Sequence, residues 1–458
     1  MTGINTVLLI IIGVLIFELL IFSHEFGHFI TAKLSGVRVN EFALGMGPKI
    51  FSFTKGETLY SLRLLPIGGY CAMEGEDEES DSPDAFSKAK VYKRMIIVIA
   101  GAVMNIILGL ILVFCLQIQA DSYADTTISG FSDSAYSSKS GLEAGDKILS
   151  IGDYKIWSSN DISYSLAMLK CTDVDGTAPV IAREKYNATL VSVYAYLSQY
   201  QDKYEKSDWY TVTKEYKKAR ADIDSAATAE QIVDIYEGVF KKMTAVKLID
   251  GTKAELPEIS VSITEKSPRF RTDVTVLRNG KEMTLNDVDF YTYLGEDGKP
   301  AISFDFYVEP IEKNFVTVIT STFNNSVSIV RMVYKSLFGL ITGRFSLSEV
   351  SGPVGVVSAV SQAASSGLET SFLDALNNII YIMAIISINL GIFNMLPLPA
   401  LDGGRFFFLI IEAIRRKPVP PKYEGIVHGV GFALLMLLIL FVSANDIARL
   451  FGGSGLFG

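Results

Sequence analysis

The sequence predicts a polytopic α-helical membrane protein with about four transmembrane helices and a large polar region outside the membrane. Three observations support this fold class. Apolar runs long enough to cross a bilayer core lie at residues 6–22, 95–118, 377–397 and 426–442. Hydrophobic residues make up 49% of the 458 residues and the mean hydropathy is +0.32. Charged residues nevertheless make up 20%, so a substantial part of the chain must be in water.

The first run, residues 6–22, is broken only by Glu18 and is close to the minimum length of a span. No basic residue precedes it and no small-residue cleavage site follows it, so we expect a retained span rather than a signal peptide. Residues 316–342 are different, because Arg331 and Lys335 interrupt an apolar pattern of helical spacing. This pattern favours an amphipathic helix at the membrane interface, followed by a linker that reaches residue 375.

Basic residues near the spans predict the orientation in the cell membrane, because such residues stay in the cytosol. They crowd the entrance of the second span and recur between the third and fourth spans, as Lys88, Lys90, Lys93, Arg94, Arg405, Arg415, Arg416 and Lys417. We therefore expect residues 33–94 and 403–425 in the cytosol. Residues 120–375 and both termini are then extracytoplasmic.

The regions between the spans carry strand and helix patterns. Residues 38–72 alternate in polarity, which predicts a membrane-associated β-hairpin or small sheet. Residues 141–151, GLEAGDKILSI, predict a turn followed by a strand, and residues 273–309 predict strands joined by a hairpin turn at Arg278-Asn279-Gly280-Lys281. Residues 188–247 have apolar residues at helical spacing. These patterns predict an α+β domain, 120–171 with 273–315, that carries a mainly helical insertion, 172–272.

Charge and cysteine content exclude some functions. The net charge of −9 argues against nucleic acid as a partner, because phosphate binding needs a basic surface. The only cysteines, Cys71, Cys115 and Cys171, are widely spaced, which fits neither a disulfide framework nor a cysteine zinc site.

The strongest local motif is His24-Glu25-Phe26-Gly27-His28, at the end of the first span. On a helix, residues four apart share a face, so both imidazoles can bind one metal ion. Zinc accepts imidazole nitrogen readily, and Glu25 could take a proton from water bound to the metal. The alternative is a pair of surface histidines beside an ordinary glutamate. Ionisable groups at the end of a membrane span are costly and usually functional, which favours a site for one Zn²⁺.

A catalytic zinc site needs a third protein ligand. Asp402 is one candidate, because it follows a segment in which Pro397 and Pro399 break the helix of the third span. The same aspartate could instead cap the helix that begins near Gly403. His428 is the only other histidine, and its position at the start of the fourth span also suits an interfacial or packed side chain. The residues alone leave these alternatives open.

The motifs together resemble the site-2 protease family, specifically the regulator-of-sigma-E protease (RseP) type. The matching segments are HEFGH at 24–28, FALGMGP and LPIGGYCAMEGE in the first loop, GLEAGDKILSI at 141–151, SGPVG at 351–355 and NMLPLPALDGGR at 394–405. The resemblance implies that His24, His28 and Asp402 bind zinc and that Glu25 is the general base. It also implies that Asn394 helps to hold the substrate or to stabilise the oxyanion, although an asparagine there could simply cap a helix end.

Residues 121–171 and 273–309 together resemble a PDZ domain, a fold that binds extended peptides by adding a strand to a sheet edge. The chain departs from that family through the insertion at 172–272. An open groove for peptide C-termini or a substrate ectodomain, a groove covered by the insertion, and a passive size filter all remain compatible with the sequence.

The resemblance implies a zinc-dependent intramembrane endopeptidase, a hydrolase of peptide bonds. Its substrates would be single-span membrane proteins such as anti-sigma factors, or leftover signal peptides. A membrane zinc transporter or sensor would need further ligands along the spans, and none is evident. A catalytically inactive scaffold that binds peptides through its PDZ-like domain would be expected to have lost Glu25 or a ligand, and the sequence has neither loss.

Overall fold

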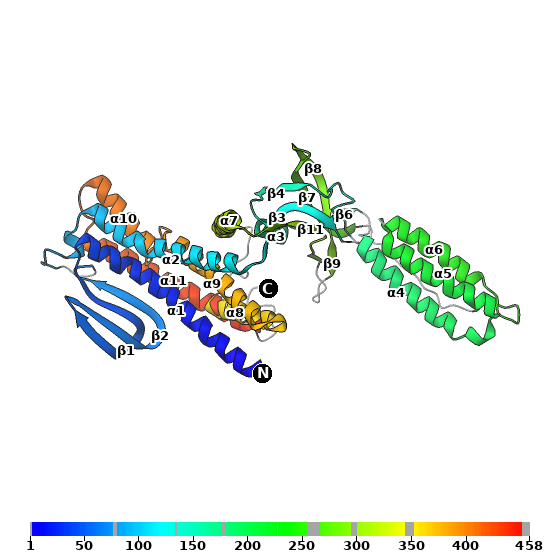
Figure 1. Cartoon of the computed structure of the whole chain (residues 1–458), viewed down its shortest axis with the longest axis horizontal. Coiled ribbons are helices and arrows are strands. Elements are labelled where there is room, and N and C mark those ends of the chain that lie inside the picture. The colour runs from blue at the N-terminus through cyan, green and yellow to red at the C-terminus, as the bar shows by residue number, and fades with distance from the viewer. Residues whose placement is uncertain are drawn as a thin grey trace. The chain divides into compact units, whose positions relative to one another are not determined.

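The computed structural model describes residues 2–76, 80–132, 135–175, 179–226, 228–254, 266–294, 300–343 and 352–450. The chain divides into two compact units (Figure 1). The first comprises Met1–Asp121 and Lys313–Gly458, and the second comprises Ser122–Glu312.

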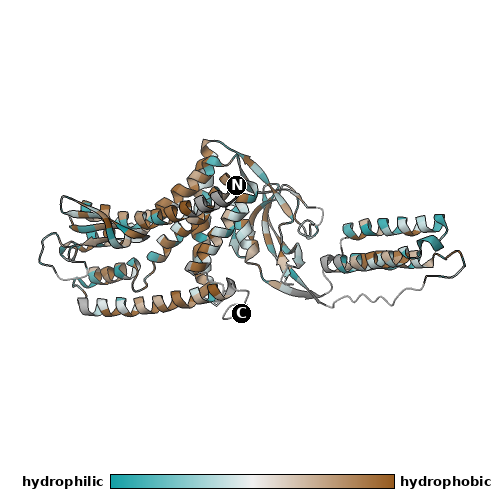
Figure 2. Cartoon of the chain, turned by 90° about the horizontal axis from the view of Figure 1, so that it is seen from below, coloured by the Kyte–Doolittle hydropathy of each residue, from teal (hydrophilic) through white to brown (hydrophobic). Residues whose placement is uncertain are grey.

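The first unit contains the helices that are long and apolar enough to cross a membrane: α1 (Thr2–Ser35), α2 (Val91–Gln119), α9 (Phe372–Asn394) and α11 (Pro421–Leu450). Their apolar stretches confirm the four predicted spans, and Figure 2 shows apolar residues along these helices. The apolar run at 6–22 is shorter than the helix that contains it, because α1 continues without a break to Ser35, and the first glycine with positive φ after it is Gly36. The His-Glu-Phe-Gly-His motif therefore lies inside the helix.

Small residues let the three central helices pack closely, as in other membrane bundles. A β-carbon on Gly27 of α1 would lie 2.4 Å from the Ala100 carbonyl oxygen of α2. A β-carbon on Gly391 of α9 would lie 2.8 Å from the Ala102 carbonyl oxygen. Further along α2, a β-carbon on Gly109 would lie 2.5 Å from Cγ1 of Ile388 on α9, a side chain that is fully buried. The backbones of α1 and α9 therefore both approach α2.

The predicted β-hairpin is present as β1 (Val39–Lys55) and β2 (Thr58–Met73), and it folds back on itself. Residues 41–44 pair with residues 59–62 on one side and with residues 69–72 on the other. Gly45 and Gly47 have φ of +77° and +86°, so the Gly-x-Gly-Pro segment supplies the bend in β1.

A polar cluster stabilises the folded hairpin. Glu41 accepts hydrogen bonds from Ser61 Oγ at 2.6 Å and from Arg63 Nη2 at 2.8 Å. Burial opposes ionisation of Glu41, but these hydrogen bonds outweigh it and lower the pKa of Glu41 to about 2. Arg63 also donates to the Gly47 carbonyl oxygen at 2.8 Å, so one guanidinium connects the bend to the strand.

The remaining elements of the first unit are the short helix η1 (Phe86–Lys88), α7 (Phe315–Ile341), α8 (Pro353–Thr370) and α10 (Asp402–Arg415). The helix predicted at 316–342 is thus present as α7, and its interfacial location stays a prediction. Residues 344–351 of the predicted linker lie outside the described residues, and so does Ser351 of the SGPVG segment.

The second unit contains a sheet with strand order β11-β3-β4-β7-β6, in which β5 also pairs with β4 and β8 with β7. The strands are β3 (Ser122–Phe131), β4 (Lys147–Ile151), β5 (Tyr154–Lys155), β6 (Cys171–Asp175), β7 (Lys266–Arg278), β8 (Lys281–Phe290) and β11 (Phe306–Glu312). A separate pair is β9 (Thr292–Leu294) with β10 (Pro300–Ile302), and α3 (Ser159–Ala167) packs against β3 and β4. Asn279 and Gly280 both have positive φ, 52° and 75°, which confirms the predicted hairpin turn.

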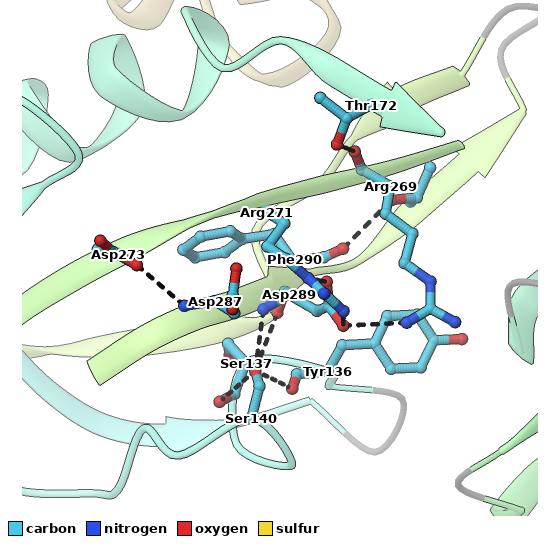
Figure 3. Close-up of polar contacts among 11 residues, drawn as sticks. Tyr136, Ser137, Ser140, Thr172, Arg269, Arg271, Asp273, Asp287, Asp289 and Phe290 are labelled. Atoms are coloured by element: carbon cyan, nitrogen blue, oxygen red, sulfur yellow. Dashed lines mark hydrogen bonds and ion pairs between the residues drawn. The ribbon is translucent and has the colours of Figure 1, made fainter. Parts of the chain in front are cut away.

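Polar contacts connect the sheet to the loop after β3 (Figure 3). Asp289 of β8 accepts two hydrogen bonds from Arg271, at 2.8 and 2.9 Å, and one from Arg269 at 3.2 Å. The Asp289 backbone N–H donates to Ser140 Oγ at 3.0 Å. One aspartate therefore connects β7, β8 and the loop.

The described residues between β6 and β7 in sequence include the helices α4 (Pro179–Ser198), α5 (Lys206–Ser225) and α6 (Ala229–Ala245), with the short η2 (Gln201–Lys203) between α4 and α5. They share an apolar core of their own, so the helical pattern at 188–247 is confirmed. The helical part is narrower than the predicted 172–272, because residues 172–175 and 266–272 belong to strands. Residues 176–178, 227 and 255–265 lie outside the described part of the chain.

Candidate metal centre

His24, His28 and Asp402 come together in the first unit, although Asp402 is far from the histidines in sequence. Helix α1 places the two imidazoles one turn apart on one face, and α10 begins at Asp402. Asp402 Oδ2 lies 3.1 Å from His24 Nε2 and 3.3 Å from His28 Nε2. The two Nε2 atoms are 3.2 Å apart. Three potential metal-binding atoms thus form a nearly equilateral triangle.

The size of this triangle fits zinc. Nitrogen and oxygen ligands in a tetrahedral zinc site lie about 2.0–2.2 Å from the metal, and hence roughly 3.3 Å from one another. Asp402 Oδ2 is buried and accepts no regular hydrogen bond within the described residues, which leaves its lone pairs available. Two imidazoles and one carboxylate also leave the fourth position open for water or substrate.

The second nitrogen of His28 is hydrogen-bonded to the backbone. His28 Nδ1 lies 2.8 Å from the carbonyl oxygen of Ile97 on α2. A carbonyl oxygen can only accept, so Nδ1 carries the proton and Nε2 offers a free lone pair to the site. Such a contact fixes both the tautomer and the ring orientation of a metal ligand.

Asn394, the last residue of α9, lies beside the other imidazole. Its side-chain amide nitrogen is 3.4 Å from His24 Nδ1. An amide nitrogen can only donate, and a flip of the side-chain amide would bring its oxygen to this place, where it could accept the Nδ1 proton of a His24 that binds metal through Nε2. The structure thus gives Asn394 a contact with a predicted ligand, whereas its predicted role toward substrate stays a prediction.

Gly101 of α2 is a site residue that the sequence analysis missed. A β-carbon on Gly101 would lie 2.4 Å from His28 Nε2 and 2.7 Å from His24 Cε1. Any larger residue would occupy the space of the two imidazoles. In the sequence, Gly101 is one small residue within an uninterrupted apolar run, which does not distinguish it from the packing glycines of the same helix.

The turn between α9 and α10 determines where Asp402 lies. The N-cap of α10 is Leu401, so Asp402 is not the capping residue that was considered as an alternative. The two positions after Asp402 must be glycine. A β-carbon on Gly403 would lie 2.0 Å from the Leu396 carbonyl oxygen, and one on Gly404 would lie 2.4 Å from the Leu398 carbonyl oxygen.

His428 lies outside the group of three. The Ala400 backbone N–H donates to its Nδ1 at 2.9 Å, and its ring centroid is 5.7 Å from that of Phe408. The sequence prediction of a packed histidine therefore agrees with its position.

Glu25 lies between the imidazole face of α1 and the β-hairpin. It is half-buried, and a β-carbon on Gly69 of β2 would lie 3.5 Å from Glu25 Cγ. The segment 69–72 that passes Glu25 pairs with residues 41–44 on one side. Within the described residues, no further strand pairs with its other edge. A carboxylate, a candidate metal centre and a sheet edge are thus neighbours.

Comparison with known proteins extends these observations to nearly the whole chain. The sequence profile of peptidase family M50 matches residues 12–438. The chain is 31% identical over 459 residues to the regulator of sigma-W protease RasP of Bacillus subtilis, covering 98% of this chain and 99% of that protein. It is 33% identical over 454 residues to the zinc metalloprotease RasP of Geobacillus kaustophilus, covering 96% and 98%. The zinc metalloprotease RasP of Oceanobacillus iheyensis is 31% identical over 446 residues, with the same coverage.

Proposed function

Because the chain belongs to peptidase family M50, the family of the site-2 proteases, we propose that His24, His28 and Asp402 hold its catalytic zinc ion and that Glu25 is its general base. The protein is a zinc-dependent metalloendopeptidase of the membrane. The observation that carries the assignment of residues is the triangle of ligand atoms, with sides of 3.1, 3.2 and 3.3 Å.

Zinc supplies Lewis acidity, which lowers the pKa of water toward about 7 and polarises a scissile carbonyl. The protein contributes the rest of the chemistry. Glu25 takes the proton from the attacking water and later donates it to the leaving amine. The Ile97 carbonyl oxygen and the Asn394 amide hold the two imidazoles in the orientation that faces the metal. An amide at position 394 can also donate to the developing oxyanion once substrate is present.

The outer edge of β2 is the proposed binding site for the scissile segment. A transmembrane helix must unwind before cleavage, because its peptide bonds are hydrogen-bonded within the helix. Residues 69–72 offer backbone hydrogen-bonding groups beside Glu25, so an unwound segment can add there as a strand. This arrangement would place a peptide bond close to both the base and the metal.

The second unit is proposed to be PDZ-like and extracytoplasmic, carrying α4–α6 as an insertion. Its turn at 141–151, its hairpin at residues 278–281 and its antiparallel sheet support this proposal. Strand β11 forms one edge of the described sheet and pairs with β3. That edge is where a peptide C-terminus or a substrate ectodomain would bind, and a passive size filter is the alternative.

Single-span membrane proteins are the proposed substrates. The relative from Bacillus subtilis is named regulator of sigma-W protease, which supports an anti-sigma-factor-like substrate ahead of leftover signal peptides. A zinc transporter would need successive ligand groups along the spans. The described residues hold a single group of three His, Cys, Asp or Glu side chains placed to bind a metal.

The decisive experiment compares the wild type with Glu25→Gln in zinc content and in cleavage of a single-span test substrate. We expect the variant to keep its zinc and to lose cleavage by roughly 10²- to 10⁴-fold, because only the base is removed. Asp402→Asn should lose zinc and activity together. A transporter would keep zinc flux in Glu25→Gln, and an inactive scaffold would not cleave even as the wild type.

A further inference from the structure

We propose that His428 of α11 is a positioning residue for Asp402, acting through the backbone of Ala400. This inference rests on the proposed zinc site, because it concerns how one of the three ligands is held in place. It assigns a role to a histidine that lies outside the ligand group.

Ala400 has an unfavourable backbone conformation. Its φ is +72°, in the left-handed region that favours glycine. A residue with a β-carbon is strained in this region. Ala400 lies two residues before Asp402, so its conformation sets the direction in which the chain enters α10. Such a conformation persists only where surrounding contacts hold it.

His428 provides such a contact. The Ala400 N–H donates to His428 Nδ1 at 2.9 Å. A peptide N–H can only donate, so Nδ1 must accept with its lone pair and the ring proton must lie on Nε2. Other N–H groups of this turn use carbonyls within it: Leu398 donates to Leu396 at 2.7 Å, and Leu401 donates to Leu398 at 3.3 Å. The contact from Ala400 instead connects the turn to a different helix.

Close packing reinforces this hydrogen bond. A β-carbon on Gly431, almost one turn after His428, would lie 2.1 Å from Pro399 Cβ. A β-carbon on Gly404, on the other side of the turn, would lie 3.3 Å from His428 Cε1. The turn is therefore enclosed between the start of α10 and the first half of α11, and it has little freedom to shift without moving His428.

Neighbouring residues in the same stretch of α11 are exposed. Val430, Phe432 and Leu434 are 57%, 58% and 62% exposed, as suits side chains that face lipid. The His428 side chain is only 18% exposed and points toward the turn. A polar side chain on such a helix is costly unless it has a function. Holding the backbone that carries a metal ligand is a function that this geometry provides.

The test uses the full-length protein in detergent and measures zinc affinity by chelator competition, with helix content from circular dichroism as the folding control. His428→Leu removes the acceptor, and we expect zinc affinity to fall roughly 10- to 100-fold, as for other lost partners of metal ligands. His428→Asn should stay within about threefold of the wild type, because Asn Oδ1 is attached to Cγ as Nδ1 is in histidine. Val430→Leu, on the exposed part of α11, is the matched control.

Ala400→Gly provides a second, independent test of the inference. Glycine adopts positive φ at no steric cost, so in the His428→Leu background it should restore a large part of the lost zinc affinity. Equal zinc affinity in His428→Leu and wild type would overturn the inference. So would equal losses in His428→Leu and His428→Asn, or no recovery on adding Ala400→Gly. If the proposed zinc site itself is wrong, Asp402→Asn will leave zinc binding unchanged. This result distinguishes a failure of the zinc site from a failure of the inference about His428.

Discussion

Gly101 on α2 lies opposite His28 on α1, so closely that a β-carbon at position 101 would be 2.4 Å from His28 Nε2. The metal centre therefore depends on a residue with no side chain as much as on its ligands. The same helix offers the Ile97 carbonyl oxygen to His28, so α2 must pack against the imidazole face of α1.

Gly101→Ala is expected to reduce bound zinc to less than about a tenth of the wild-type amount, because the new methyl group occupies the space of the ligand nitrogens. The measurement is zinc stoichiometry of the purified protein by atomic absorption. Gly109→Ala is the matched control, because its β-carbon would crowd Ile388 at 2.5 Å on the same helix without touching the imidazoles. Wild-type zinc content in Gly101→Ala would contradict the arrangement of α1 and α2.

Cys71→Pro is expected to slow cleavage of a single-span substrate about tenfold while zinc content stays unchanged. Cys71 lies in the outer segment of the folded hairpin, and its backbone N–H interacts with Glu25. Proline removes that N–H, which helps to hold Glu25 beside the proposed edge, and one hydrogen bond is worth about 1 kcal/mol. Cys71→Ala keeps the N–H and serves as the control. Turnover at the wild-type rate in Cys71→Pro would show that this contact between the edge and the base contributes nothing to cleavage.

Arg278→Met is expected to destabilise the second unit by about 3 kcal/mol near neutral pH, because it leaves the fully buried Asp146 without its cation. Arg278 donates to the Asp146 carboxylate at 2.7 Å from both Nε and Nη2. Both tryptophans, Trp157 and Trp209, lie in this unit, so urea unfolding followed by tryptophan fluorescence measures its stability. Lys281→Met, at the other side of the same turn, is the control.

The effect of Arg278→Met should also depend on pH. Burial tends to raise the pKa of Asp146, but the hydrogen bonds from Arg278 and from the Glu143 N–H lower it below its ordinary value. A lowered folded-state pKa contributes stability above the unfolded pKa of about 3.9, and this stability is lost as pH falls through the folded pKa. The difference between wild type and variant should therefore shrink below about pH 4. A difference that stays constant well below pH 4 would argue against the ion pair.

Asp446→Ala is expected to lower the free energy of unfolding of the first unit by about 1–2 kcal/mol, which is what a helix cap usually contributes. Asp446 of α11 accepts hydrogen bonds from the N–H groups of Gly352 and Gly355, both at 2.8 Å, at the start of α8. Asp446→Asn keeps an acceptor oxygen and should fall between wild type and alanine. Thermal denaturation in detergent, followed by circular dichroism, provides the measurement. Identical melting of all three proteins would show that this contact contributes nothing.

Local patterns predicted much of the fold. Long apolar runs identified the four candidate spans because a bilayer core demands that length of helix. The Asn279-Gly280 pair identified a hairpin turn because both residues tolerate positive φ. The motif at 24–28 identified two potential zinc ligands because a helix places residues four apart on the same face. Each of these three patterns consists of residues that are close together in the sequence.

Helix ends were less predictable. The apolar run of the first span stops before His24, yet α1 continues to Ser35. Hydropathy marks where lipid contact ends, whereas a helix ends where its backbone hydrogen bonding ends. The two coincide only when a helix leaves the membrane without entering a protein core, and His28 is buried in such a core.

The chemical groups of the site could be read from the sequence: two imidazoles, a neighbouring carboxylate, and a second carboxylate after a proline-broken helix. The family resemblance implied the pairing of Asp402 with the histidines, which the residues alone left open. The space left by Gly101 and the hydrogen bond from Ala400 to His428 emerged only from the folded chain. The reason is physical. A glycine or histidine has the same local pattern whether it faces lipid or a metal ligand, and the packing of distant helices decides which of the two it faces.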